Sequence, residues 1–115
     1  MQVASATRAL ALALAVLVVA AAAAVGAAAR PAAATHTVVI ENLQFSPTDL
    51  TVNRGDRIVW VNKDLFPHTA TAQGKVFDSQ SIAANASWSY VASKPGTYPY
   101  SCIFHPTMKA TLTVK

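Results

Sequence analysis

The stretch Tyr100–Met108 reads YSCIFHPTM and lies between two segments in which apolar and polar residues alternate. These flanking segments, Gly96–Ser101 and Lys109–Lys115, are predicted strands, because successive side chains of a strand point to opposite faces of a sheet. The stretch between them is therefore expected to form the loop that joins the last two strands. It carries three side chains with metal-binding atoms, each three residues after the one before: Cys102, His105 and Met108.

The rest of the chain after residue 34 repeats the same two-residue alternation and shows no helical period. β-branched and aromatic residues fill short runs, and turn residues such as those of Asn53–Asp56 separate the runs. This pattern predicts an all-β fold, an antiparallel Greek-key sandwich of about seven to eight strands. The further expected strands are Thr37–Ile40, Leu50–Val52, Arg57–Asn62, Thr69–Ala72 and Ala86–Ala92, with a turn at Phe45–Pro47.

The side chains of the Tyr100–Met108 loop make a soft-leaning ligand set. A thiolate, an imidazole and a thioether suit copper better than calcium or magnesium. His68 follows Pro67 at the start of an expected strand and is the candidate for a second imidazole. Two imidazoles, one thiolate and a weak axial thioether form the blue-copper electron-transfer site. Each residue alone more commonly has a structural role, and it is their combination that predicts one copper ion held by His68, Cys102, His105 and Met108.

The segment before the β domain has a different composition. Residues 2–34 are mostly Ala, Val and Leu, with Arg8 near the start and Ala32-Ala33-Ala34 at the end. A positive start, an apolar stretch and small residues at the end predict a signal peptide over residues 1–34 of a protein exported to a bacterial periplasm. The alternative is an uncleaved membrane anchor, because the apolar run is long enough to span a bilayer. Residues 35–115 would then form a single domain.

Charge and cysteine content narrow the class of function. The whole chain has a net charge of +4, and residues 35–115 carry seven basic and five acidic residues, a net charge of +2. The basic residues are scattered, which argues against a nucleic-acid partner. Cys102 is the only cysteine, so no internal disulfide is expected. An unpaired thiol in an oxidising compartment is exposed to oxidation, which favours a role for it as a metal ligand.

At these residues the chain resembles the cupredoxins, and within them amicyanin and the plastocyanin-like proteins. Amicyanin-type sequences carry the short Cys-x-x-His-Pro-x-Met loop that appears here at positions 102–108. The resemblance covers nearly all of residues 35–115 and implies the same four metal ligands. Two positions depart from the family. Thr69 stands where the family usually has Asn after the first His ligand, and Thr107 stands where amicyanin has a large apolar residue.

The expected function is that of a one-electron carrier that cycles between Cu(I) and Cu(II) and catalyses nothing itself. A copper-binding protein for transfer or storage, without a shuttle role, is the alternative. An oxidase module would need more histidines than the three present. We expect a monomer whose redox partner is a c-type cytochrome or a periplasmic dehydrogenase. The docking surface is predicted around the second His ligand: Phe66, Pro67, His105 and Pro106.

Overall fold

The computed structural model of the protein describes Ala15, Val18 and residues 32–115, and the last of these ranges holds eight strands and one 3₁₀ turn. The elements are β1 (Thr35–Glu41), β2 (Gln44–Ser46), β3 (Asp49–Val52), β4 (Arg57–Asn62), β5 (Thr71–Ala72), η1 (Gln73–Lys75), β6 (Ser87–Val91), β7 (Gly96–Ser101) and β8 (Lys109–Val114). The predicted signal segment, residues 1–34, lies almost wholly outside the described residues. None of the helices within the described residues is long and apolar enough to cross a membrane.

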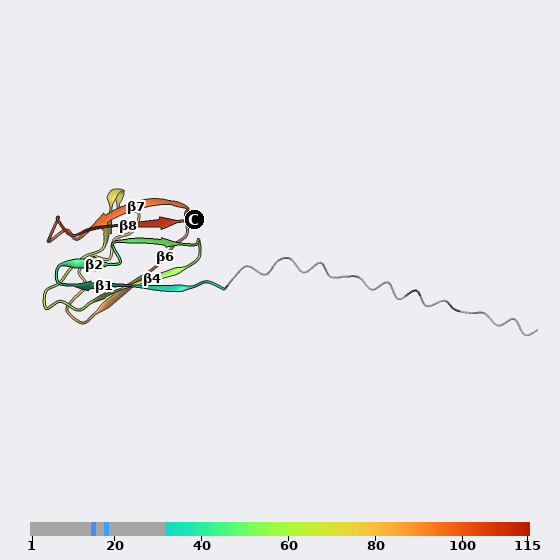
Figure 1. Cartoon of the computed structure of the whole chain (residues 1–115), viewed down its shortest axis with the longest axis horizontal. Helices are drawn as coiled ribbons and strands as arrows, with labels where there is room; N and C mark the ends of the chain where they lie inside the picture. The colour runs from blue at the N-terminus through green and yellow to red at the C-terminus, as the bar shows by residue number, and fades with distance from the viewer. Residues whose placement is uncertain (1–14, 16–17, 19–31) are drawn as a thin grey trace, which may run out of the picture. The chain divides into compact units, whose positions relative to one another are not determined.

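Two four-stranded sheets pack against each other (Figure 1). One sheet has the order β2-β1-β4-β6 and the other β3-β8-β7-β5. The predicted all-β sandwich is thereby confirmed, but its sheets are mixed rather than wholly antiparallel: β1 pairs in parallel with β4, and β3 with β8. After β2 the chain leaves the first sheet to form β3 in the second, and it returns as β4. A strand that re-enters a sheet after such a crossover can lie parallel to its neighbour.

The alternation that predicted the strands places their apolar side chains in one core. In β4, Ile58, Trp60 and Asn62 are buried, whereas the residues between them are only partly buried. Trp60 lies at the centre of the core, where its indole N–H donates to the hydroxyl of Tyr100 over 3.3 Å. Removing a buried aromatic side chain of this size costs about 3–5 kcal/mol. Trp60 thus joins the two sheets, because Tyr100 belongs to β7.

Two local predictions were wrong. Phe45 was expected in a turn, but it lies in β2, where it is buried and its ring packs 4.8 Å from that of Tyr100. The chain turns before β2, at Asn42 and Leu43, which both have positive φ angles, and it bends after β2 at Pro47, so only the end of the predicted turn is correct. The strand expected over Thr69–Ala72 is reduced to Thr71–Ala72. The residues before it leave the sheet because Thr69 hydrogen-bonds to the loop that follows β7.

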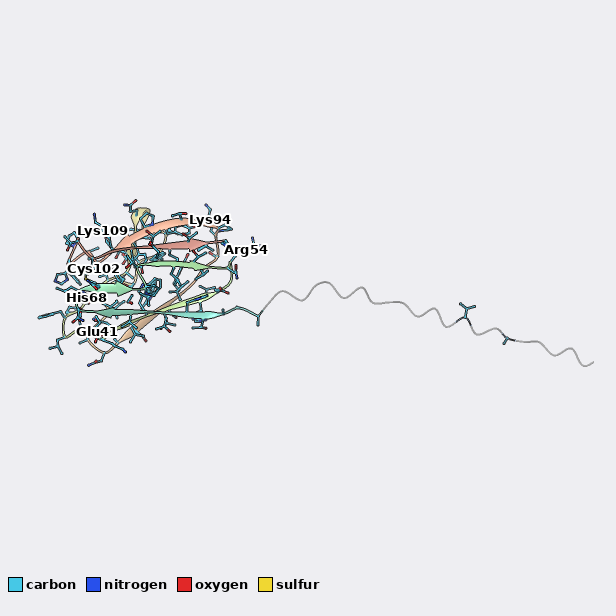
Figure 2. The ribbon with its side chains drawn as sticks, in the orientation of Figure 1. Glu41, Arg54, His68, Lys94, Cys102 and Lys109 are labelled. Carbon is cyan, nitrogen blue, oxygen red and sulfur yellow. The ribbon has the colours of Figure 1, made fainter. Side chains whose placement is uncertain are left out.

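The loops that carry the predicted ligands meet at one end of the sandwich. His68 and Cys102 lie close together there, whereas Arg54 and Lys94 mark the opposite end (Figure 2). The loop after β4 and the loop after β7 both emerge at the first of these ends. The fold therefore brings together residues that are more than thirty positions apart, as the 34-residue separation of the His68 and Cys102 contact shows.

Candidate metal centre

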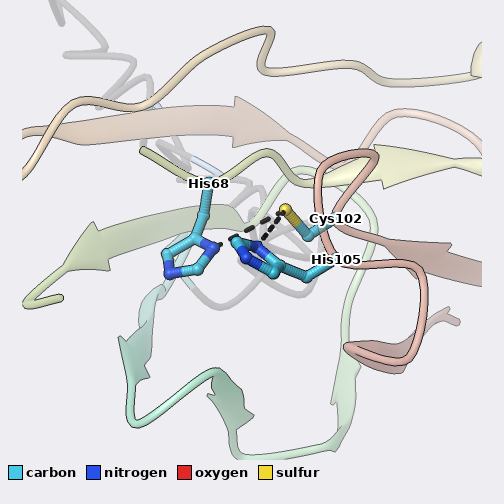
Figure 3. Close-up of side chains that lie close together, drawn as sticks. All are labelled: His68, Cys102 and His105. Atoms are coloured by element: carbon cyan, nitrogen blue, oxygen red, sulfur yellow. Dashed lines mark hydrogen bonds between the residues drawn. The ribbon is translucent and has the colours of Figure 1, made fainter. Parts of the chain in front are cut away.

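Two loops build the site (Figure 3). The first holds His68, whose N–H and C=O both bond to Ile82, over 3.1 and 2.7 Å. The second joins β7 to β8 and begins at Cys102. It is closed by backbone bonds: His105 N–H donates to the Cys102 carbonyl over 3.3 Å, and Met108 N–H donates to the His105 carbonyl over 2.9 Å. Both backbones are thereby fixed before any metal binds.

Three of the four predicted ligands have their donor atoms together. The Cys102 sulfur lies 3.6 Å from Nδ1 of His68 and 4.0 Å from Nδ1 of His105. All three donor atoms lie within 4.8 Å of one another. These separations allow one ion to bind all three atoms with bonds of about 2.0–2.3 Å, the range for imidazole and thiolate ligands of zinc. Met108, the fourth predicted ligand, is buried at the end of the same loop.

His68 is held in one orientation by a carboxylate. Its Nε2 atom lies 2.8 Å from Oδ2 of Asp64, which leaves Nδ1 to face the Cys102 sulfur. Asp64 also accepts the N–H groups of Asn42, over 2.7 Å, and Leu43, over 3.0 Å. Burial opposes the ionisation of Asp64, but hydrogen bonds from the Leu43 N–H, His68 and the Asn42 N–H outweigh it and lower the pKa of this carboxyl. An ionised carboxylate on Nε2 raises the basicity of the imidazole as a ligand.

The Cys102 thiol is wholly enclosed. Its residue has 0% exposure, and its sulfur accepts the backbone N–H of Thr69 over 3.3 Å. The N–H of the next residue, Ile103, donates to Oγ1 of Thr69 over 3.0 Å. Thr69 therefore bonds to the loop that begins at Cys102 through both its backbone and its side chain. Thr69, which stands at the position where the resemblance predicted Asn, thus ties the two loops together.

The second imidazole lies closer to solvent. His105 is half-buried, whereas His68 is fully buried. Pro67 and Pro106 are both exposed, and so are large apolar side chains from the same loops and from the β1–β2 turn. Those side chains are Leu43, Leu65, Phe66, Ile103 and Phe104. This end of the molecule thus combines a partly exposed metal-site ring with apolar surface.

Asp64 is the site residue that the sequence analysis missed. The available signal was an acidic residue four positions before His68. Such a spacing places two side chains together in a helix, but the loop after β4 is not helical. The contact forms because Asn62 shapes this loop: its side-chain amide donates to the Phe66 carbonyl over 2.8 Å and its Oδ1 accepts the Asp64 N–H over 3.0 Å.

The comparisons with known proteins all point to the same family. A family model described as a cupredoxin-like domain matches residues 9–114. Amicyanin-alpha of Methylorubrum extorquens is 30% identical over 90 residues, which cover 74% of this chain and 75% of that protein. A plastocyanin of Synechococcus sp. is 28% identical over 96 residues, covering 67% and 70%. A purple cupredoxin from Nitrosopumilus maritimus has 26% identity and a TM-score of 0.65, covering 70% of this chain and 99% of that structure.

The donor set fits copper. A thiolate and two imidazoles with a nearby thioether are the soft and borderline ligands that copper prefers, and hard oxygen ligands of the kind that calcium or magnesium needs are not among them. The chemistry of these side chains and the family match together confirm the copper cofactor expected from the sequence.

Proposed function

This chain belongs to the cupredoxin-like family, and on that basis we propose that it is an exported type 1 (blue) copper protein that carries single electrons between redox partners. The proposal rests mainly on the burial of two predicted metal ligands. Cys102 and His68 both have 0% exposure, and the Cys102 sulfur lies 3.6 Å from Nδ1 of His68. Ligands held in this way keep one geometry in both oxidation states. Export to the periplasm, or anchoring to its membrane, rests on the apolar segment before residue 35.

The four ligands have distinct roles in this proposal. Cys102 would provide the thiolate, His68 and His105 would provide imidazole nitrogens through Nδ1, and Met108 would provide a weakly bound thioether. Bound copper supplies the one-electron change between Cu(II) and Cu(I). The chain keeps the ligands from rearranging, since Asp64 orients His68 and Thr69 ties the sulfur to the neighbouring loop. Because four side chains would fill the coordination positions of the ion, no position would remain for a substrate, and in this proposal the protein is not itself an enzyme.

Electrons enter and leave near His105 in this proposal. The ring is half-buried, and Phe66, Pro67 and Pro106 around it are exposed. An apolar surface with a charged rim suits a small, transient redox interface, in which charges mainly set the rate of encounter. Lys63, just after β4, and Lys109, the first residue of β8, are both exposed next to these loops and would form part of that rim. The partner would be a c-type cytochrome or a periplasmic dehydrogenase that docks on the monomer.

Visible spectroscopy of the purified protein tests the function. The Cu(II) form should be intensely blue through charge transfer from the Cys102 thiolate, and ascorbate should bleach it. Repeated reduction and reoxidation should restore the full colour without loss of copper. A copper-transfer or storage protein would instead release the ion to a chelator during the cycles. A colourless Cu(II) complex, or a Cys102→Ser variant that is still blue, would refute the proposal.

A further inference from the structure

A line of hydroxyl groups leads from the Cys102 loop to the carboxylate of Asp78. The backbone N–H of Ile103 donates to Oγ1 of Thr69 over 3.0 Å. Oγ1 of Thr69 lies 2.9 Å from Oγ1 of Thr71, and the Thr71 hydroxyl donates to Oδ1 of Asp78 over 3.0 Å. We call the three residues Thr69, Thr71 and Asp78 the hydroxyl relay.

The chemistry of the groups sets the direction of every bond in the relay. An ionised carboxylate only accepts, so the single proton of the Thr71 hydroxyl is committed to Asp78. The Thr71 oxygen must then receive the proton of Thr69, whose own oxygen receives the N–H of Ile103. All the donors thus point toward Asp78. Hydrogen bonds in such a chain polarise and strengthen one another.

A second set of bonds holds Asp78 in place. The Thr71 and Asp78 backbones form a β-bridge. The adjacent residues add a pair of bonds: Ser79 N–H donates to the Ala70 carbonyl over 3.0 Å, and Ala70 N–H donates to Oγ of Ser79 over 2.8 Å. Oδ1 of Asp78 also accepts the N–H of Gln80 over 2.9 Å. The carboxylate therefore occupies a fixed position at the outer end of the relay.

The inner end of the relay adjoins the Cys102 sulfur. The N–H of Thr69 donates to the Cys102 sulfur over 3.3 Å, and Ile103 directly follows Cys102. Hydrogen bonding around this sulfur is one of the levers that set the potential of a blue-copper site. We propose that Asp78 is a positioning residue for the copper site, which acts through the hydroxyls of Thr71 and Thr69 to set the reduction potential. The inference rests on the copper-carrier function proposed above.

A double-mutant cycle tests the relay on the full copper-loaded chain. Asp78→Asn should raise the reduction potential, because losing a negative charge at the end of a polarised chain destabilises the more positive Cu(II) state. In a Thr71→Val background, which interrupts the chain, the same substitution should have little further effect. Thr71→Ser keeps a hydroxyl and should restore the coupling. An equal shift in the wild-type and Thr71→Val backgrounds, or no shift at all, overturns the proposal.

Amide hydrogen exchange of the Cu(I) form gives a second readout that is independent of electron transfer. Asp78→Asn and Thr69→Val should each speed exchange at the Ile103 N–H, because the acceptor of that group is weakened or removed. Unchanged exchange at Ile103 in both variants would refute the relay. Asp49→Asn is the matched control for charge: Asp49 is exposed on β3 and belongs to neither loop.

The outcomes for this inference and for the proposed function can be told apart. A blue protein in which Asp78 is not coupled to the copper site refutes only this inference. A wild-type protein that is not blue refutes the proposed function.

Discussion

Nε2 of His68 lies 2.8 Å from Oδ2 of Asp64, while Nδ1 of the same ring faces the Cys102 sulfur at 3.6 Å. One carboxylate thus fixes both the tautomer and the orientation of a buried, predicted copper ligand. The same carboxylate accepts both N–H groups of the β1–β2 turn at Asn42 and Leu43. This turn places an exposed leucine, at 49% exposure, at the end of the sandwich where the ligands lie. Asp64 therefore links the predicted copper ligand His68 to the surface turn at Asn42 and Leu43.

Asp64→Asn should weaken copper binding roughly 10–100-fold, the usual cost of losing a carboxylate behind a ligating histidine. Asn has one accepting oxygen, whereas Asp64 uses two, so at least one of its bonds to His68 or the β1–β2 turn must be lost. Competition with a copper chelator measures the affinity. Asp49→Asn removes the same charge from an exposed position on β3 and should bind copper as the wild type does. Equal affinities for the two variants would contradict a role for Asp64 in holding the ligand.

Short-range patterns were enough to predict much of this site. The spacing of Cys102, His105 and Met108 places all three on one loop between alternating segments, and the structure has that loop between β7 and β8. The Pro67-His68 pair at the start of an expected strand predicted the second imidazole. These features are local in the sequence and do not depend on any tertiary contact.

The missed features depend on contacts between loops. The bond from Asp64 to His68 needs a loop shape that Asn62 sets through its own side chain. The relay pairs Thr71 with Asp78 through a bridge that has no alternating pattern. Parallel pairing of β1 with β4 follows from a crossover between sheets, which the alternation within each strand does not encode. None of these contacts produces a short-range periodic pattern in the sequence.

Met108→Leu should leave the protein blue and raise its reduction potential. A thioether donates electron density and so favours the electron-poor Cu(II) state, whereas a leucine of similar volume donates nothing and still excludes water. Met108 is buried, with 3% exposure, so an apolar replacement fits the same surroundings. Cyclic voltammetry gives the potential, and visible absorption reports whether the thiolate–copper bond persists. A lower potential, or loss of the blue colour, would show that Met108 is not a weak axial donor.

The ionised side chain of Asp56 should stabilise the fold at neutral pH, and this stabilisation should be lost in acid. Its carboxylate accepts from His36 and from the N–H groups of Ala34 and Asn53, and these bonds, that from His36 foremost, lower its pKa from the ordinary 3.8. A carboxyl whose pKa is lower in the folded state stabilises the fold fully above its ordinary pKa and loses that contribution as pH falls below it. The thermal midpoint of Asp56→Asn should therefore lie below that of the wild type at pH 7.

The same difference should shrink below about pH 4, because the wild-type carboxyl then becomes protonated. Thermal melts from pH 7 to pH 3, with both proteins in the same copper state, measure the gap. Asp49→Asn again serves as the control, since no side-chain hydrogen bond to the exposed Asp49 is found among residues 32–115. A gap between wild type and Asp56→Asn that stays constant across this range would mean that the bonds do not depend on ionisation.

Phe66→Glu should slow electron exchange while leaving the copper site intact. Phe66 is 64% exposed in the loop just before His68, so its side chain contributes contact area outside the coordination sphere. A charge in the middle of an apolar contact must be desolvated on docking, and we expect the second-order rate to fall at least about fivefold, equivalent to about 1 kcal/mol. Stopped-flow mixing with a reduced c-type cytochrome measures this rate, and the visible spectrum checks the site.

Val91→Glu is the matched control for this substitution. Val91 is 43% exposed and pairs with Arg57, the first residue of β4, whereas Phe66 lies in the loop that begins after Asn62, the last residue of β4. The two variants therefore add the same charge to exposed apolar positions at opposite ends of one strand. If His105 is the point of electron exchange, only Phe66→Glu should slow the reaction, because a transient interface covers a small area around the ring. Equal slowing by both variants would indicate a general effect of charge, and slowing by Val91→Glu alone would place the contact at the other end of the sandwich.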